Sequence, residues 1–265
     1  MRLLGGMALL LSLHLGAAEL VLDLQTGPLT LNSTGLLNHP KAQDILVPRD
    51  VSYQRSMQYR AVPMAELLRG IAPTAHLQIL SSDGFSAELR AAPLLQSEGA
   101  QAWLAVEDPA SPWPALGPGK PSAGPFYLVW KNPAEGDIGP EQWPFQIARV
   151  RQIAPLQERF PALFPAASAS AEEQAGFVQF QKNCLACHRL NRAGDSAFGP
   201  DLNIPHSPTE YLAGDFLRRY IRDPQSMRRW PEGRMSGFSR DALKDRELDQ
   251  LIAYLRHMAG RKDKP

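Results

Sequence analysis

NCLACHRL, residues 183–190, contains the only two cysteines of this 265-residue chain. Cys184 and Cys187 are two residues apart, and His188 follows the second cysteine directly. A pair at this spacing can form a redox-active disulfide, supply half of a zinc site or attach a c-type haem. A structural zinc site usually needs four ligands, and the sequence has no second cysteine pair. A redox-active pair is expected in a βαβ context, whereas here a helical pattern precedes the motif and a loop containing glycine and proline follows it.

The motif therefore favours haem attachment. Each thiol can form a thioether with one vinyl group of the porphyrin, which brings the next residue, His188, under the iron as its proximal ligand. We predict one covalent haem c, bound to Cys184 and Cys187, with His188 on the iron.

The N-terminal sequence MRLLGGMALLLSLHLGAAEL predicts export. Arg2, a mostly apolar run from Met7 to Leu15 and the small residues after it have the order of a secretory signal peptide that is cut after Ala18. The apolar run falls short of the roughly 20 residues that span a bilayer. We expect a signal peptide at 1–18 and a soluble periplasmic protein with no transmembrane segment after cleavage.

The amino-acid composition divides the chain that remains after signal cleavage into two domains. The segment PALFPAASASA, residues 161–171, is rich in alanine, serine and proline and predicts a linker. We assign this linker to residues 157–171. It separates a domain at 19–156 from a domain at 172–265. The formal net charge of +1 gives no sign of a nucleic-acid partner.

The second domain has helical patterns at both ends. Ser170 and Glu173 have the S-x-x-E spacing of a capping box and predict a helix start. Gly176 and Phe180 lie one turn apart on that helix. Near the C-terminus a second apolar stripe ends at Gly260, a helix stop, and it comprises Leu248, Leu251, Ile252, Leu255 and Met258.

Residues 172–260 resemble a class I cytochrome c. In that family a glycine and an aromatic residue, at the positions of Gly176 and Phe180, pack against the last helix, and 251–255 (LIAYL) resembles the sequence of that helix. The family also has a Gly-Pro pair whose proline carbonyl accepts the ring N–H of the ligand histidine. The resemblance gives this role to Pro200, twelve residues after His188.

The sixth iron ligand should lie further along the chain. A methionine thioether favours ferrous iron and raises the potential. Met235 lies in RMSGF, which resembles the family's Arg-Met-Pro-Gly-Phe loop, with Ser236 in place of proline. We predict Met235 over the alternatives Met227, Met258 and His206.

An arginine-rich stretch precedes Met235. Some of these side chains, with Trp230, are candidates to pair with haem propionates, and others to form a basic rim for an acidic redox partner. A solvated charged face is the alternative. The arginines are Arg218, Arg219, Arg222, Arg228, Arg229 and Arg234.

Residues 19–156 predict a strand-rich α+β domain. Short apolar runs such as LVLDL, HLQIL and PFYLVW alternate with Gly-Pro and Asp-Gly turns, and Pro63 opens a short helix. The order YRAVPMAELLRG, ILSSDGFSAEL, AWLAVED, GPFYLVW and QWPFQIARVRQI resembles the sulfite-oxidase-type molybdopterin-binding domain. The chain is thus expected to be multidomain, with this domain followed by an all-α cytochrome domain.

Enzymes of that family hold molybdenum through a cysteine that this domain lacks. Asp50 stands near its place, so we expect a domain without molybdenum cofactor, kept for docking or ligand binding. Candidates to line a relic pocket are His39, His76, Arg49 and Arg55.

These features together predict a non-enzymatic electron carrier between periplasmic redox proteins. The alternatives are a subunit or fused relay of a molybdenum-dependent oxidoreductase, which the missing cysteine disfavours, and a haem-based sensor, which Met235 disfavours.

Overall fold

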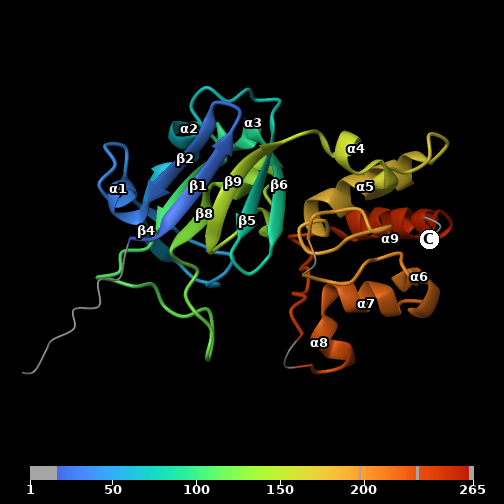
Figure 1. Ribbon diagram of the computed structural model, residues 1–265. Helices are drawn as coiled ribbons and strands as arrows, with labels where there is room; N and C mark the ends of the chain where they lie inside the picture. Colours follow the sequence, from blue (N-terminus) through green and yellow to red (C-terminus); the bar gives the residue numbers. More distant parts are fainter. Residues whose placement is uncertain (1–16, 197, 231–232, 263–265) are drawn as a thin grey trace, which may run out of the picture.

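The computed structural model describes residues 17–196, 198–230 and 233–262. Strands fill the N-terminal part of the chain and helices the C-terminal part, as Figure 1 shows. Residues 1–16 of the predicted signal peptide lie outside the described residues. In the described part of the chain, no helix has the length and apolar character needed to cross a bilayer.

The N-terminal part contains two β-sheets. One has the order β2-β1-β9-β5-β6 and the other the order β3-β4-β7-β8. Neighbouring strands are antiparallel except for β1 and β9, which pair in parallel. The strands are β1 (Glu19–Leu24), β2 (Gly27–Asn32), β3 (Gln43–Val47), β4 (Met57–Pro63), β5 (His76–Ser81), β6 (Ser86–Arg90), β7 (Gln101–Val106), β8 (Phe126–Lys131) and β9 (Ile147–Ile153).

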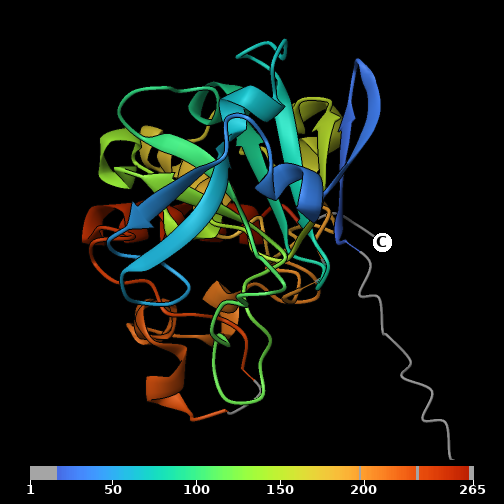
Figure 2. The same cartoon turned by 90° about the vertical axis from the view of Figure 1, so that its left-hand side faces the viewer.

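A single hydrophobic core joins the two sheets. Strand β1 contributes Leu20 and Leu22, which alternate along the strand and are both fully buried. Strand β8 (FYLVWK) is buried from Phe126 to Trp130, and only its last residue is partly exposed. The predicted strand-rich α+β organisation of the N-terminal part is therefore confirmed. Figure 2 views this part from its outer side, with the helical part of the chain behind it.

Short helices connect the strands. Pro63 is the N-cap of α2, as predicted, because proline has no N–H to leave unpaired at a helix start. The helices of this part are α1 (Ser33–Leu37), α2 (Met64–Leu67), α3 (Ala91–Leu94) and the 3-10 helices η1 (Pro133–Gly136) and η2 (Pro140–Gln142).

The C-terminal part is helical and has a core of its own. Its two long helices are α5 and α9, which pack against each other (Figure 1). Its elements are α4 (Leu156–Arg159), the 3-10 helix η3 (Pro161–Leu163), α5 (Ala171–Asn183), α6 (Pro208–Tyr211), α7 (Phe216–Arg222), α8 (Pro224–Met227) and α9 (Asp245–Ala259).

Helix α5 begins as the capping box predicts. The Ser170 side chain accepts a hydrogen bond from the amide of Glu173, and the Glu173 carboxylate accepts one from the amide of Ser170. Two backbone N–H groups at the helix start are thereby satisfied.

The crossing of α5 and α9 depends on Gly176. A Cβ at this position would lie 1.9 Å from the carbonyl oxygen of Gln250 and 2.7 Å from Cβ of Tyr254, so only glycine fits. One turn further on, the rings of Phe180 and Tyr254 pack with their centroids 5.3 Å apart. The predicted contact of Gly176 and Phe180 with the last helix is confirmed, and so is the burial of the predicted stripe on α9.

The segment predicted as a linker, 157–171, differs from that expectation. Leu163 is fully buried in the C-terminal core, and Phe164 packs on Phe177 of α5 with ring centroids 4.6 Å apart. Tyr254 donates a 2.7 Å hydrogen bond to the carbonyl of Leu163. The segment is attached to the helical part, because its few large apolar residues pack into the core formed by α5 and α9.

Candidate functional site

The two cysteines and the histidine lie on one tight turn at the end of α5. Cys184 is the C-cap of the helix, and its carbonyl accepts hydrogen bonds from the amides of Cys187, at 3.1 Å, and His188, at 2.8 Å. Residues three and four positions apart on such a turn project on the same side. The turn therefore gathers both thiols and the imidazole at one place.

The imidazole of His188 is held in one orientation. Its Nδ1 lies 2.8 Å from the carbonyl oxygen of Pro200, which can only accept, so Nδ1 donates and Nε2 is left with its lone pair. Gly199 forms the wall of this cradle, since a Cβ there would lie 2.5 Å from Cε1 of His188. Burial lowers the pKa of His188, and the hydrogen bond to Pro200 opposes this. The ring is thus neutral at about pH 7 and oriented, as a metal-binding histidine should be.

The cysteine thiols are poor nucleophiles in this fold. Burial raises the pKa of Cys184 to about 12, and the nearby carboxylate of Glu141 adds to this shift. The pKa of Cys187 is raised for the same two reasons. Redox-active cysteine pairs need at least one thiol with a lowered pKa, because the thiolate is the attacking species. The environment of the pair therefore disfavours the thiol–disulfide interpretation.

The zinc interpretation gains no support either. Within residues 17–196, 198–230 and 233–262, no three side chains of histidine, cysteine, aspartate or glutamate are close enough to share a metal ion. The described fold therefore gathers no set of three such ligands around the cysteine pair.

The loop carrying Met235 is pinned to α7. Phe238 is buried and donates a 3.0 Å backbone hydrogen bond to Ile221. Gly237 lies so close to α7 that a Cβ would be 2.3 Å from the carbonyl oxygen of Arg222. Met235 itself is half-buried and packs against the C-terminal core.

A second contact brings this loop to the histidine side of the site. The guanidinium carbon of Arg234 lies 5.1 Å from the ring centroid of Phe198, the residue before Gly199. The loop before Met235 and the loop that supports His188 are therefore neighbours. This arrangement is compatible with Met235 as the second axial ligand, which remains a prediction.

The other candidate ligands occupy different surroundings. Met258 is 1 % exposed within the stripe of α9 that forms the core. His206 has a largely exposed side chain beside Glu210, with 4.0 Å between Nδ1 and Oε2. Met227 is half-buried at the end of α8.

Five of the six arginines before Met235 divide into two groups. Arg218 pairs with Asp215 and Asp249, and Arg222 pairs with Asp245 and donates to the carbonyls of the loop around Phe238. The second group stacks on aromatic rings: Arg219 on Phe216, Arg228 on Trp230 and Arg234 on Phe198. The first two arginines thus have structural partners, and the second group contains the better candidates for contacts outside the chain.

Comparison with known proteins agrees with this geometry. The family model for cytochrome c matches residues 173–259. The C-terminal part of the chain is a cytochrome c domain. Membership implies covalently bound haem c and supports a role in haem-based electron transfer. The residues of the cysteine turn fit haem c, because the turn at Cys184 gathers two thiols beside an imidazole whose Nε2 keeps its lone pair for a metal ion. No curated protein matches the chain.

In the N-terminal part, Asp50 is a structural residue. It is 2 % exposed, and its carboxylate accepts hydrogen bonds from Tyr59 at 2.8 Å and Tyr127 at 3.2 Å. The backbone amides of Ser52 and Tyr53 also donate to it, at 2.9 and 2.8 Å. Four donors satisfy the carboxylate within the protein, so it has little capacity left for a metal ion.

The residues proposed to line a relic pocket do not gather around Asp50. His76 lies on β5, where Nδ1 is 3.3 Å from the carboxylate of Glu88. His39 follows α1 and accepts a hydrogen bond from the amide of Lys41. Arg49 and Arg55 are exposed on the turn that contains Asp50.

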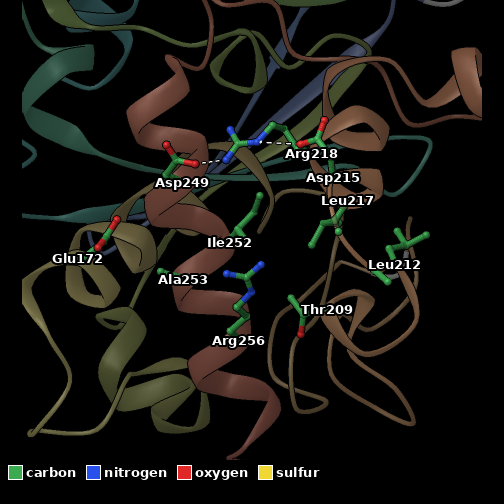
Figure 3. Close-up of a pocket in the computed structure, with 12 residues that line it drawn as sticks. Glu172, Thr209, Leu212, Asp215, Leu217, Arg218, Asp249, Ile252, Ala253 and Arg256 are labelled. Carbon is green, nitrogen blue, oxygen red and sulfur yellow. Dashed lines mark hydrogen bonds and ion pairs between the residues drawn. The ribbon is translucent and has the colours of Figure 1, made fainter.

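A groove of the cytochrome c domain lies apart from the cysteine turn. It separates α9 from α6 and α7, and its walls carry Arg218, Asp249, Ile252 and Arg256 (Figure 3). Arg218 crosses one end of it, paired with Asp215 and Asp249. None of the predicted haem ligands lines this groove.

Some residues that shape the site carry no signal in the sequence. Asn203 is fully buried, and its amide donates to Asn191 at 2.7 Å and to the carbonyl of Met258 at 2.6 Å. These bonds tie the loop after Pro200 to the end of α9. Glu141 approaches the cysteines from the other part of the chain, over a sequence distance that no local pattern reveals.

Proposed function

We propose that the protein is an exported c-type cytochrome that carries single electrons between periplasmic redox partners, with one covalent haem. The observation that carries this proposal is the cysteine turn, with His188 held against Pro200 and Gly199. The cytochrome c domain supports the electron-transfer role, and the signal-like N-terminal sequence supports export.

In this proposal the chain supplies attachment, ligation and orientation. A bound haem c supplies a one-electron iron couple. Cys184 and Cys187 would hold it by thioether bonds, and His188 and Met235 would supply the nitrogen and sulfur ligands of its iron. The Pro200 carbonyl fixes the histidine tautomer and increases the basicity of Nε2. The thioether of Met235 favours the ferrous state and raises the potential.

The N-terminal domain acts, in this proposal, as a docking or ligand-binding module without molybdenum. The order of its short sequence motifs supports a sulfite-oxidase-type origin. The use of Asp50 by four internal donors supports the loss of the metal. The whole protein is then an electron carrier and not an enzyme.

Mass spectrometry and metal analysis test the proposal. Protein matured in the periplasm of a host that makes both c-type haem and molybdenum cofactor should carry one haem that resists acid–acetone extraction. Iron should be stoichiometric and molybdenum at background. The Cys184→Ala/Cys187→Ala double variant should lose the covalent haem. Stoichiometric molybdenum with oxygen-atom transfer to or from sulfur substrates would instead support the fused-relay alternative.

Near-infrared absorption tests the axial pair. The oxidised protein should show the weak charge-transfer band of a methionine–iron bond, and Met235→Ala should abolish it. Met227→Ala is the matched control, since it removes a half-buried thioether from the same arginine-rich region. Loss of the band in the control alone would assign the ligand to Met227.

A further inference from the structure

The N-terminal domain contacts the loop that carries the haem cysteines. The amide of Ser86, the first residue of β6, donates a 3.2 Å hydrogen bond to the carbonyl of Ala186. Leu185 and Ala186, the two residues between the cysteines, are only 8 % and 6 % exposed. In Figure 1, β5 and β6 form the side of the sheet that faces the helical domain. The sheet thus lies directly against the attachment motif.

A second segment of the N-terminal domain closes over the same place. Helix η2 packs against α5, and a Cβ at Gly139 would lie 3.1 Å from Cε of Lys182. Lys182 forms a 2.7 Å ion pair with Asp137, the residue after η1. Helix η2, which contains Glu141, also packs against β6. Two separate segments therefore meet on the cysteine side of the cytochrome c domain.

A polar network holds the two domains together. Arg159 of α4 forms a 2.9 Å ion pair with Glu88 of β6 and a second ion pair with Asp195, which follows the cysteine turn. Gln78 of β5 also donates to Asp195, at 2.5 Å, and accepts from Arg151 of β9. The side chains of Arg159 and Glu88 are 16 % and 14 % exposed, so these charges are partly desolvated and strongly oriented.

Through these contacts the N-terminal domain occupies the surface of the cytochrome c domain around the two cysteines. We propose that the N-terminal domain is a fixed cover over the cysteine edge of the haem, so that external redox partners reach the haem from another side. The inference rests on the proposed function, because it places haem at Cys184 and Cys187. Thioether bonds fix the vinyl edge of the porphyrin to these sulfurs, and the covering segments are those around Ser86 and Glu141.

Within a chain, domains usually move unless their interface is large or strongly bonded. Here the hydrogen bond to Ala186, the Lys182–Asp137 pair and the Arg159 network act at separate points along the interface. A cover fastened at several points resists opening by rotation about any one of them. The cysteine edge is therefore expected to stay covered in the resting protein.

The test uses the haem-loaded full chain and the double variant Asp137→Lys/Glu88→Gln. The first change repels Lys182, and the second removes the carboxylate charge that pairs with Arg159 across the interface, with little change in side-chain shape. Asp44→Lys is the matched control, because Asp44 and Asp137 have equally exposed side chains, at 82 %, and each pairs with one basic residue. The measurement is amide hydrogen exchange in the haem-bearing peptide 183–188, followed by mass spectrometry.

We expect exchange in this peptide to rise about tenfold in the double variant and to stay unchanged in Asp44→Lys. The second-order rate of haem reduction by a small uncharged hydroquinone should rise in parallel, because a new edge opens. Equal exchange and equal rates in the two variants would overturn the proposal. A chain with no covalent haem would refute the proposed function, whereas a normally attached haem with unchanged exchange would refute only the cover.

Discussion

Replacing Gly176 by alanine should drive α5 and α9 apart. The new Cβ would lie 1.9 Å from the carbonyl oxygen of Gln250, whereas a carbon–oxygen contact needs about 3.3 Å. The obstructing atoms are the backbone of Gln250 and the Cβ of Tyr254, which no rotamer change can move. The helices must therefore separate by about 1.4 Å at the crossing.

The loss in the free energy of unfolding follows from the packing where α5 and α9 cross. Overpacking of a well-packed core destabilises by about 1–3 kcal/mol, and here the rings of Phe180 and Tyr254 lose contact as well. Alanine offsets about 1 kcal/mol through its better helix propensity. A net loss of roughly 2 kcal/mol in the free energy of unfolding lowers the Tm of a domain of this size by about 8–16 °C.

The assay is thermal unfolding of the haem-loaded protein, followed by haem absorbance because this signal reports on the cytochrome c domain. Gly260→Ala is the control, since Gly260 has a φ of −78° and its new Cβ would meet only the carbonyl of His257, at 3.6 Å. If Gly176→Ala lowers the Tm no more than this control does, the reasoning about the crossing is refuted.

Three further outcomes are expected. Gly199→Ala should displace the ring of His188, because the new Cβ would lie 2.5 Å from Cε1, and reduce the low-spin haem fraction in the absorption spectrum; an unaltered spectrum would contradict this. Burial raises the pKa of Glu141 to about 7. Because the folded pKa exceeds the unfolded one, the favourable contribution is complete at acid pH and is lost as pH rises towards and through 7. Stability should fall by about 2–3 kcal/mol between about pH 5 and about pH 8, and Glu141→Gln should flatten the curve; parallel curves would show that Glu141 is not the group responsible. A haem fragment 155–265 should melt above a fragment 170–265, since the extra residues include two buried leucines, each worth about 1.5–3 kcal/mol; equal melting points would show that they contribute nothing.

The cytochrome c domain could be predicted in detail because its signals are local. A cysteine pair followed by histidine, a capping box and an apolar stripe each lie within one or two helical turns. Their geometry follows from the helix period, so Gly176, Phe180 and the stripe of α9 appear in the structure where the pattern puts them. Even the contact between Pro200 and His188 spans only twelve residues.

The surroundings of Asp50 could not be predicted in the same way. Its carboxylate bonds to Tyr59, nine residues away, and to Tyr127, 77 residues away on another strand. No periodicity links residues so far apart, and the sequence alone presents Asp50 as a polar residue in a loop. Only the pairing of β4 and β8 with β7 brings the two tyrosines to it.

The boundary between the domains shows how composition can mislead. Alanine, serine and proline dominate 161–171, yet a few large apolar residues decide where the segment lies, and Leu163 is fully buried between the helices. The true connection is shorter, since β9 ends at Ile153 and α4 begins at Leu156. A tether of two residues keeps the domains at a high effective concentration for each other. The covering contacts at the cysteine turn are therefore favoured by connectivity as well as by the ion pairs of Arg159, and a longer insertion at 154–155 should weaken them without changing either core.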